Sequence, residues 1–90
     1  MKNLQKLRIG IVGCGAIGSS LAKEIVMGMR KDASLAALFD IRPEKAQLLS
    51  RKLTQNTKLC VDSLKALIKR VDLVIEASSA KASWEIARQS

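Results

Sequence analysis

Aromatic residues, cysteine and long hydrophobic runs are all scarce in this chain. Phe39 and Trp84 are the only aromatic side chains among 90 residues, although 48% of the residues are hydrophobic. A core of Leu, Ile, Val and Ala is typical of an α/β domain. No apolar run approaches the roughly twenty residues that cross a bilayer, and residues 1–6 lead straight into a predicted strand rather than into the hydrophobic stretch of a signal peptide. We therefore expect a cytoplasmic protein of one domain, with no membrane partner.

The two cysteines are too few for a disulfide framework. Cys14 lies within a glycine turn and Cys60 within a predicted strand, so we expect both to be reduced thiols in apolar surroundings. For Cys14 two interpretations stay open. It is either a spacer in the turn or a reactive thiol, because a helix N-terminus lowers the pKa of a cysteine.

Positive charge exceeds negative charge, with 16 Lys and Arg against 8 Asp and Glu and a net charge of +8. Such a balance makes nucleic acid a partner to consider. The basic residues are spread over every segment, however, and no aromatic residues are interleaved among them to stack on bases. We therefore expect no nucleic-acid binding. The charge is interpreted as a solvated surface that also attracts a polyanionic cofactor, or as charge offset elsewhere in a longer protein.

A GxGxxG turn is the most informative motif. Gly13 allows a tight turn after a strand, Gly15 lets a diphosphate approach the backbone, and Gly18 lets the next helix lie close to the strand. The amide groups and the dipole at the helix N-terminus favour an anion there. Asp40 follows Gly18 by about twenty residues, the spacing of an acid that binds the adenosine ribose. The alternatives are a purely structural turn and a solvated acid that ends a strand.

Apolar residues recur with strand or helix periodicity along the whole chain. The first predicted helix carries an apolar residue every fourth position, ending at Ile25 and Met29, and the last one packs Ile86 and Trp84 inward. The predicted strands are residues 7–12, 35–39, 58–61 and 73–77, and the predicted helices begin near Ala16, Pro43, Asp62 or Ser63, and Ser78 or Ser79.

This alternation predicts an α/β fold with a doubly wound parallel sheet, the Rossmann fold, in the strand order 3-2-1-4. The fourth strand would lie at an open edge, so we expect an incomplete sheet and interpret residues 1–90 as the N-terminal dinucleotide-binding domain of a longer two-domain enzyme. The order places Ala77 and Ser78 beside the glycine turn. Their small side chains leave room for the nicotinamide half of a cofactor, although a serine there also serves as a plain helix cap.

Three segments resemble a known family. They are IGIVGCGAIG at residues 9–18, LAALFD followed by PEKA within residues 35–46, and VDLVIEASS at residues 71–79. Together they resemble the N-terminal domain of the L-aspartate dehydrogenase family, which is related to the homoserine dehydrogenases. The resemblance implies oxidation of L-aspartate to iminoaspartate for NAD biosynthesis, with NAD or NADP as the hydride acceptor.

The resemblance also implies roles for individual residues. The catalytic histidine of the family lies in a later substrate domain, and this chain has no histidine. We therefore assign no catalytic residue here, and expect the amino-acid substrate and the contacts of a homo-oligomer to involve that further domain. The implied cofactor residues are Gly13, Gly15, Ala16, Ile17 and Gly18 for the diphosphate, Asp40 for the adenosine ribose, and Ala77 with Ser78 for the nicotinamide side.

The charge of Asp40 predicts NAD over NADP, because a carboxylate repels a 2′-phosphate. Arg42 leaves NADP possible, since a nearby guanidinium accommodates that phosphate. Two other functions stay open. One is the cofactor domain of a sister oxidoreductase, of the homoserine dehydrogenase or dihydrodipicolinate reductase type, and the other is a non-catalytic NAD-sensing module.

Overall fold

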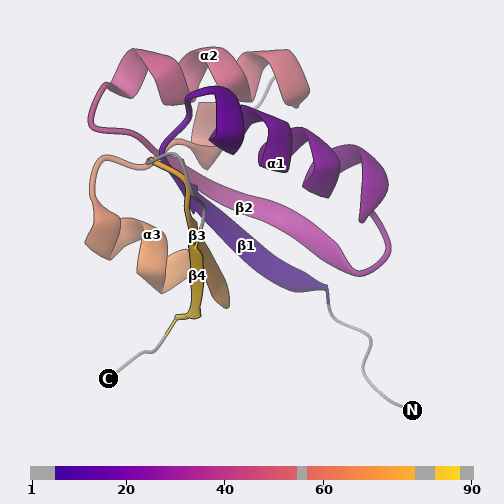
Figure 1. The fold of residues 1–90 in the computed structure, drawn as a ribbon. Helices are drawn as coiled ribbons and strands as arrows, with labels where there is room; N and C mark the ends of the chain where they lie inside the picture. Colours follow the sequence, from indigo (N-terminus) through magenta and orange to yellow (C-terminus); the bar gives the residue numbers. More distant parts are fainter. Residues whose placement is uncertain (1–5, 55–56, 79–82, 88–90) are drawn as a thin grey trace.

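A four-stranded sheet forms the middle of the computed structural model, with the strands in the order β2-β1-β3-β4 (Figure 1). Strands β1 (Leu7–Val12), β2 (Ala33–Phe39) and β3 (Leu73–Glu76) run parallel. Strand β4 (Ser83–Ile86) runs antiparallel to β3, which makes the sheet mixed. The predicted α/β class is confirmed, and only the edge strand departs from a parallel arrangement. The structure describes residues 6–54, 57–78 and 83–87.

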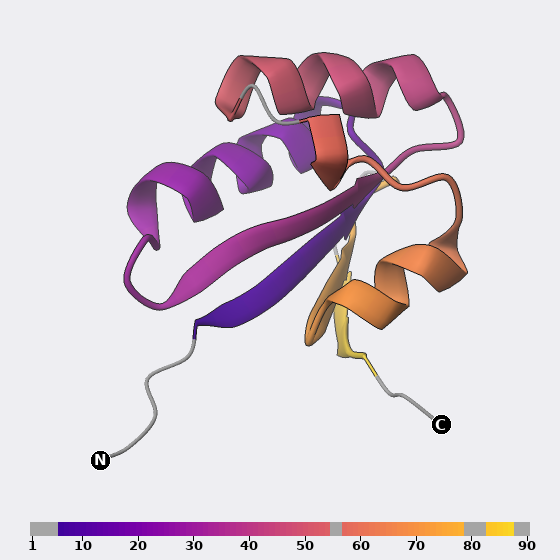
Figure 2. The ribbon, with the colours of Figure 1, turned by 180° about the vertical axis from the view of Figure 1, so that it is seen from behind.

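Helices cover both faces of the sheet, as a doubly wound arrangement requires. Helices α1 (Ala16–Gly28) and α2 (Pro43–Leu53) lie on one face. Helix α3 (Leu64–Arg70) lies on the opposite face, and Figure 2 shows the same layers from behind. Ser63 is the N-cap of α3, because its hydroxyl accepts the N–H of Ala66 at 3.0 Å. No helix in the described part of the chain is long and apolar enough to cross a membrane.

Alternating positions of β1 contribute to two apolar cores, one on each face of the sheet. Ile9 and Ile11 belong to the core under α1 and α2 and are 3% and 0% exposed. Gly10 faces α3, and a Cβ built on it would lie 2.8 Å from Leu67 Cδ2 and 2.9 Å from Val71 Cγ1. The missing side chain therefore allows α3 to pack directly on the central strand.

Small residues also let α1 pack close to the other face. Gly18, Ala22 and Ile25 are the buried residues of this helix. The predicted apolar face is confirmed at Ile25 but is wrong at Met29, which caps the C-terminal end of the helix and is 39% exposed. The helix packs through a glycine and an alanine because these let its backbone approach the strands.

The third predicted strand is reduced to a single contact with β2. The sequence predicts a strand over residues 58–61, whereas the structure has a 3-10 helix, η1 (Thr57–Leu59), followed by one parallel bridge between Cys60 and Leu38. The N–H of Val61 donates to the Leu38 carbonyl at 3.0 Å. This segment lies beside β2, where the order 3-2-1-4 places it, but one bridge is too short a ladder for a strand.

The last predicted helix is wrong over residues 83–86, which form β4. Trp84 and Ile86 are each 67% exposed and do not pack inward. Apolar residues at every second position fit a strand as well as a short helix, so periodicity alone does not decide between them. Pairing with β3 decides it, because the backbone groups at the edge of that strand gain partners. The predicted cap Ser79 lies outside the described residues.

Candidate functional site

The turn after β1 meets the segment after β3 at the carboxyl end of the sheet. The N–H of Ala77 donates to the Val12 carbonyl at 2.7 Å. A Cβ built on Gly13 would lie 2.6 Å from the backbone nitrogen of Ser78, so these two segments touch. The predicted order brings them together because β1 and β3 are neighbours at the point where the connections change sides of the sheet.

Gly13 and Gly18 fix the shape of the turn, and both are buried. Gly13 has a φ of 97°, a left-handed conformation that residues with side chains rarely adopt. A Cβ on Gly18 would lie 1.8 Å from the Gly13 carbonyl oxygen. Only glycine therefore allows α1 to begin this close to β1. These two glycines are needed for packing whether or not a ligand binds.

Gly15 differs because the space beside it is open. Among the described residues, no atom beyond its chain neighbours lies within 4 Å of a Cβ built on it. Gly15 is the N-cap of α1 and makes no side-chain cap hydrogen bond. Gly15 and Ala16 are exposed and Ile17 is half-buried, so the first amide groups of α1 are accessible to an anion. A side chain at residue 15 would project into this opening.

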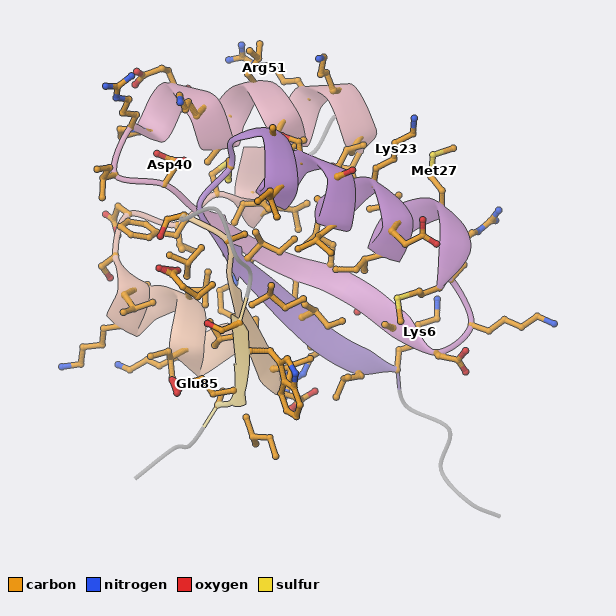
Figure 3. The ribbon with its side chains drawn as sticks, in the orientation of Figure 1. Lys6, Lys23, Met27, Asp40, Arg51 and Glu85 are labelled. Atoms are coloured by element: carbon orange, nitrogen blue, oxygen red, sulfur yellow. The ribbon has the colours of Figure 1, made fainter. Side chains whose placement is uncertain are left out.

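Asp40 lies in the loop between β2 and α2, at the same end of the sheet as the start of α1 (Figure 3). Its Oδ2 accepts the N–H of Cys14 at 2.7 Å, and its Oδ1 accepts the N–H of Arg42 at 2.8 Å. A carboxylate accepts about four hydrogen bonds, so the half-buried Asp40 keeps capacity for further donors. The structure thus places Asp40 directly against the glycine turn.

Cys14 is a buried part of the turn. Burial, together with the negative charge of Asp40, raises the pKa of its thiol to about 12. Its Sγ lies 3.8 Å from the Phe39 carbonyl oxygen, and its own carbonyl accepts the Ser19 hydroxyl at 3.2 Å. A thiol with this pKa stays protonated at neutral pH, which favours the spacer interpretation over the reactive one.

Glu76 is a polar neighbour of the turn that the sequence pattern does not indicate. It is the last residue of β3, and it accepts a hydrogen bond from the Ser78 hydroxyl at 2.5 Å. Ser78 therefore has its hydroxyl proton engaged within the protein. No group of the described residues donates to its oxygen, whose lone pairs can accept a hydrogen bond from a ligand. In the sequence, Glu76 stands two residues before Ser78, but its place in a predicted strand gave no reason to pair the two side chains.

A basic groove between α1 and α2 was also missed. It has a volume of about 600 Å³ and reaches Cys14 and Gly15 at one end. Three lysines, Lys23, Lys45 and Lys52, line it, and Figure 3 shows Lys23 projecting from α1. Their charges make the approach to the turn favourable for an anion. The lysines belong to two helices, so only the packing of these helices reveals that they share a groove.

Known proteins match this chain in sequence over most of its length. Residues 13–90 match the family model described as the NAD-binding domain of homoserine dehydrogenase. The chain is 45% identical over 85 residues to an L-aspartate dehydrogenase of Methanocaldococcus jannaschii, and 42% identical over 87 residues to one of Methanosarcina acetivorans. Each alignment covers 93% of this chain but only 31% and 30% of the relative. The chain therefore spans about a third of the length of these curated relatives.

Two solved structures share the fold. A UDP-N-acetylglucosamine 3-dehydrogenase from Acidithiobacillus ferrooxidans has a TM-score of 0.64 and 27% identity, over 81% of this chain and 21% of that one. An oxidoreductase from Thermotoga maritima has a TM-score of 0.66 and 24% identity, over 78% of this chain and 22% of that one, and this second likeness shows the fold alone. The predicted resemblance to L-aspartate dehydrogenases is confirmed, and the chain belongs to the family of the homoserine dehydrogenase NAD-binding domain.

Proposed function

We propose that these 90 residues form the NAD-binding domain of a longer two-domain enzyme that oxidises L-aspartate to iminoaspartate in NAD biosynthesis. The identity of 45% to an L-aspartate dehydrogenase supports this substrate. Such relatives are about three times as long as the stretch they share with this chain. The residues that bind the substrate, the catalytic groups and the contacts between subunits would then belong to a second domain.

The opening beside Gly15 is the observation that carries this proposal. A diphosphate at the start of α1 would meet the backbone amides around Gly15, Ala16 and Ile17. Gly13 and Gly18 would hold the turn in the shape that presents these amides. The cofactor bound there would supply the acceptor for the hydride that the substrate loses.

Asp40 and the segment after β3 would hold the two ends of the cofactor. Asp40 keeps acceptor capacity for the hydroxyls of the adenosine ribose. Ala77 is buried and Ser78 is exposed beside Gly13, and their small side chains would leave room for the nicotinamide half. The Ser78 oxygen would accept a hydrogen bond from the ribose or the carboxamide on that side.

NAD should bind more tightly than NADP, because the Asp40 carboxylate would repel a 2′-phosphate. Arg42 is the exposed residue that would weaken this repulsion. Calorimetric titration of the wild-type chain with both cofactors measures the ratio of the two dissociation constants. Equal constants would contradict the preference for NAD.

Homoserine dehydrogenase activity is the second candidate, because the matching family model is named for that enzyme. Steady-state assays of the full-length enzyme with L-aspartate and with homoserine distinguish the two substrates. We expect a higher kcat/KM for L-aspartate. Binding of NAD without turnover of either substrate would instead favour a sensing module.

Substitution of Gly15 by alanine tests the cofactor site. The new Cβ meets no other group of the described protein, so the fold should be kept, while the methyl group would occupy the space proposed for the diphosphate. We expect the dissociation constant for NADH to rise at least tenfold, a loss of about 1.4 kcal/mol. Fluorescence titration measures this change.

The matched control is Gly28→Ala at the other end of the same helix. The atoms nearest to a Cβ on Gly28 belong to the flexible side chain of Glu24, and the residue lies far along α1 from the turn. NADH affinity of this variant should equal that of the wild type. If Gly15→Ala also binds NADH as well as the wild type does, the glycine turn is not the cofactor site.

A further inference from the structure

Both carboxylate oxygens of Asp40 bind backbone amides of the protein itself. Oδ2 accepts the N–H of Cys14 at 2.7 Å, and Oδ1 accepts the N–H of Arg42 at 2.8 Å. We propose that Asp40 is a positioning residue for the anion-binding turn: its carboxylate holds the Cys14 amide and so shapes the site for a diphosphate, independently of any contact with a ribose. This inference rests on the proposed function only for the identity of the ligand.

The two hydrogen bonds of Asp40 have different origins. A bond from an aspartate to the amide two residues later is a common local turn, and Arg42 supplies that amide. The bond to Cys14 joins residues 26 positions apart, so the local chain does not produce it. It is a charge-assisted bond, a class that is shorter and about twice as strong as neutral hydrogen bonds. The carboxylate therefore links the turn after β1 to the start of α2.

The backbone of Cys14 is held on both sides. Asp40 accepts its N–H, and the Ser19 hydroxyl donates to its carbonyl at 3.2 Å. The preceding residue, Gly13, is anchored as well, because its N–H donates to the Phe39 carbonyl at 2.8 Å. Cys14 precedes the open Gly15, so fixing its peptide groups fixes the direction in which the amides at the start of α1 point.

Electrostatics and geometry predict opposite effects of removing this carboxylate. Asp40 carries a negative charge beside a site for an anion, so its charge alone weakens the binding of a phosphate. If Asp40 only bound the ribose, its removal would not change the binding of a ligand that lacks a ribose. If Asp40 positions the turn, its removal should instead weaken the binding of such a ligand, because the amides lose their shared orientation.

Inorganic pyrophosphate is the probe that separates these effects, because it carries the diphosphate and no ribose. The chain is titrated with pyrophosphate by NMR as wild type, Asp40→Ala and Asp40→Asn. We expect the dissociation constant to rise at least threefold in both variants. An unchanged or lower dissociation constant in the two variants would overturn the proposal.

Amide hydrogen exchange measures the hydrogen bond between the Cys14 N–H and Asp40 without any ligand. The Cys14 amide should exchange at least tenfold faster in Asp40→Asn than in the wild type, while the amide of Ile11 in β1 keeps its protection. Asparagine fills the same space as aspartate but carries no charge, so whichever amide its carbonyl oxygen accepts loses the charge-assisted bond. Asp40→Asn therefore decides the question even if Asp40→Ala fails to fold. Unchanged exchange at Cys14 in Asp40→Asn would contradict the proposal.

Glu44→Ala supplies the control for charge. Glu44 is exposed in the first turn of α2, close in sequence to Asp40, and accepts no hydrogen bond from the glycine turn among the described residues. Its removal should leave Cys14 exchange unchanged and should not weaken pyrophosphate binding. NADH titration of the wild type tests the proposed function separately. Failure of the wild type to bind NADH would contradict that function, whereas the exchange rate of Cys14 would still report on Asp40.

Discussion

The β1-α1-β2 unit and the β3-β4 edge of the sheet differ in how completely their side chains are covered. Ile11, Ala22 and Leu38 in the first region are 0% exposed. All residues of β4 are exposed in the second, including Trp84 and Ile86 at 67% each. The glycine turn belongs to the β1-α1-β2 unit, where packing restrains its backbone. A site for a diphosphate needs such restraint, because its amides must already point the right way.

Hydrogen bonds between Arg8 and Asp72 join the two regions at the opposite end of the sheet from the turn. Arg8 Nη2 lies 2.9 Å from Asp72 Oδ1, and the Arg8 N–H donates to Asp72 Oδ2 at 2.9 Å. The N–H of Asp72 donates in return to the Arg8 carbonyl at 2.8 Å. The side chains are exposed, so the ion pair itself contributes little stability, while the bonds made by the two backbone N–H groups fix how β3 enters the sheet beside β1.

Gly18→Ala should disrupt the packing of α1 on β1 and give the largest loss of stability. The new Cβ would lie 1.8 Å from the Gly13 carbonyl oxygen, a backbone atom that cannot turn aside. We expect the free energy of unfolding to fall by about 3 kcal/mol or more. Urea denaturation followed by circular dichroism measures it. Gly28→Ala on the same helix should change it by no more than about 1 kcal/mol, and equal losses in the two variants would disprove the close approach of α1.

The reactivity of the two cysteines should differ because Cys14 is buried in the glycine turn, whereas Cys60 lies in the half-buried segment beside β2. With the pKa of Cys14 raised to about 12 by burial, its thiolate fraction at pH 8 is about 1 in 10,000. Iodoacetamide at pH 8 should therefore label Cys60 at least about tenfold faster than Cys14, as mass spectrometry of peptides would show. The Cys60→Ala variant should stay unlabelled until urea unfolds it. Rapid labelling of Cys14 in the folded variant would restore the reactive interpretation.

Trp84→Ser should have the smallest effect, because the side chain is 67% exposed. We expect a loss of less than about 1 kcal/mol in the free energy of unfolding. Leu38→Ala in β2 is the matched comparison, and removal of this fully buried side chain should cost about 2–5 kcal/mol. Both values come from urea denaturation followed by circular dichroism. A loss in Trp84→Ser as large as that in Leu38→Ala would mean that the β4 surface is covered in solution.

The first half of the fold could be predicted from the sequence because each of its signals agrees with the others. The strand Leu7–Val12, the helix from Ala16 and the position of Asp40 follow from apolar periodicity and glycine spacing. Residues 58–61 and 83–86 could not be predicted, since short runs of apolar residues fit more than one local structure. Their final conformation depends on how many backbone partners the neighbouring strand offers.

The sequence by itself determined that this chain has a glycine turn between a strand and a helix, an acid at the end of the next strand, and an α/β order. Only the tertiary structure decided what each residue in the turn does. Gly13 and Gly18 are confined by neighbouring backbone, whereas Gly15 faces open space. Asp40 reaches a turn 26 residues away through one hydrogen bond. The physical reason is that a glycine or a carboxylate has the same chemistry wherever it stands, and only the atoms packed around it set its role.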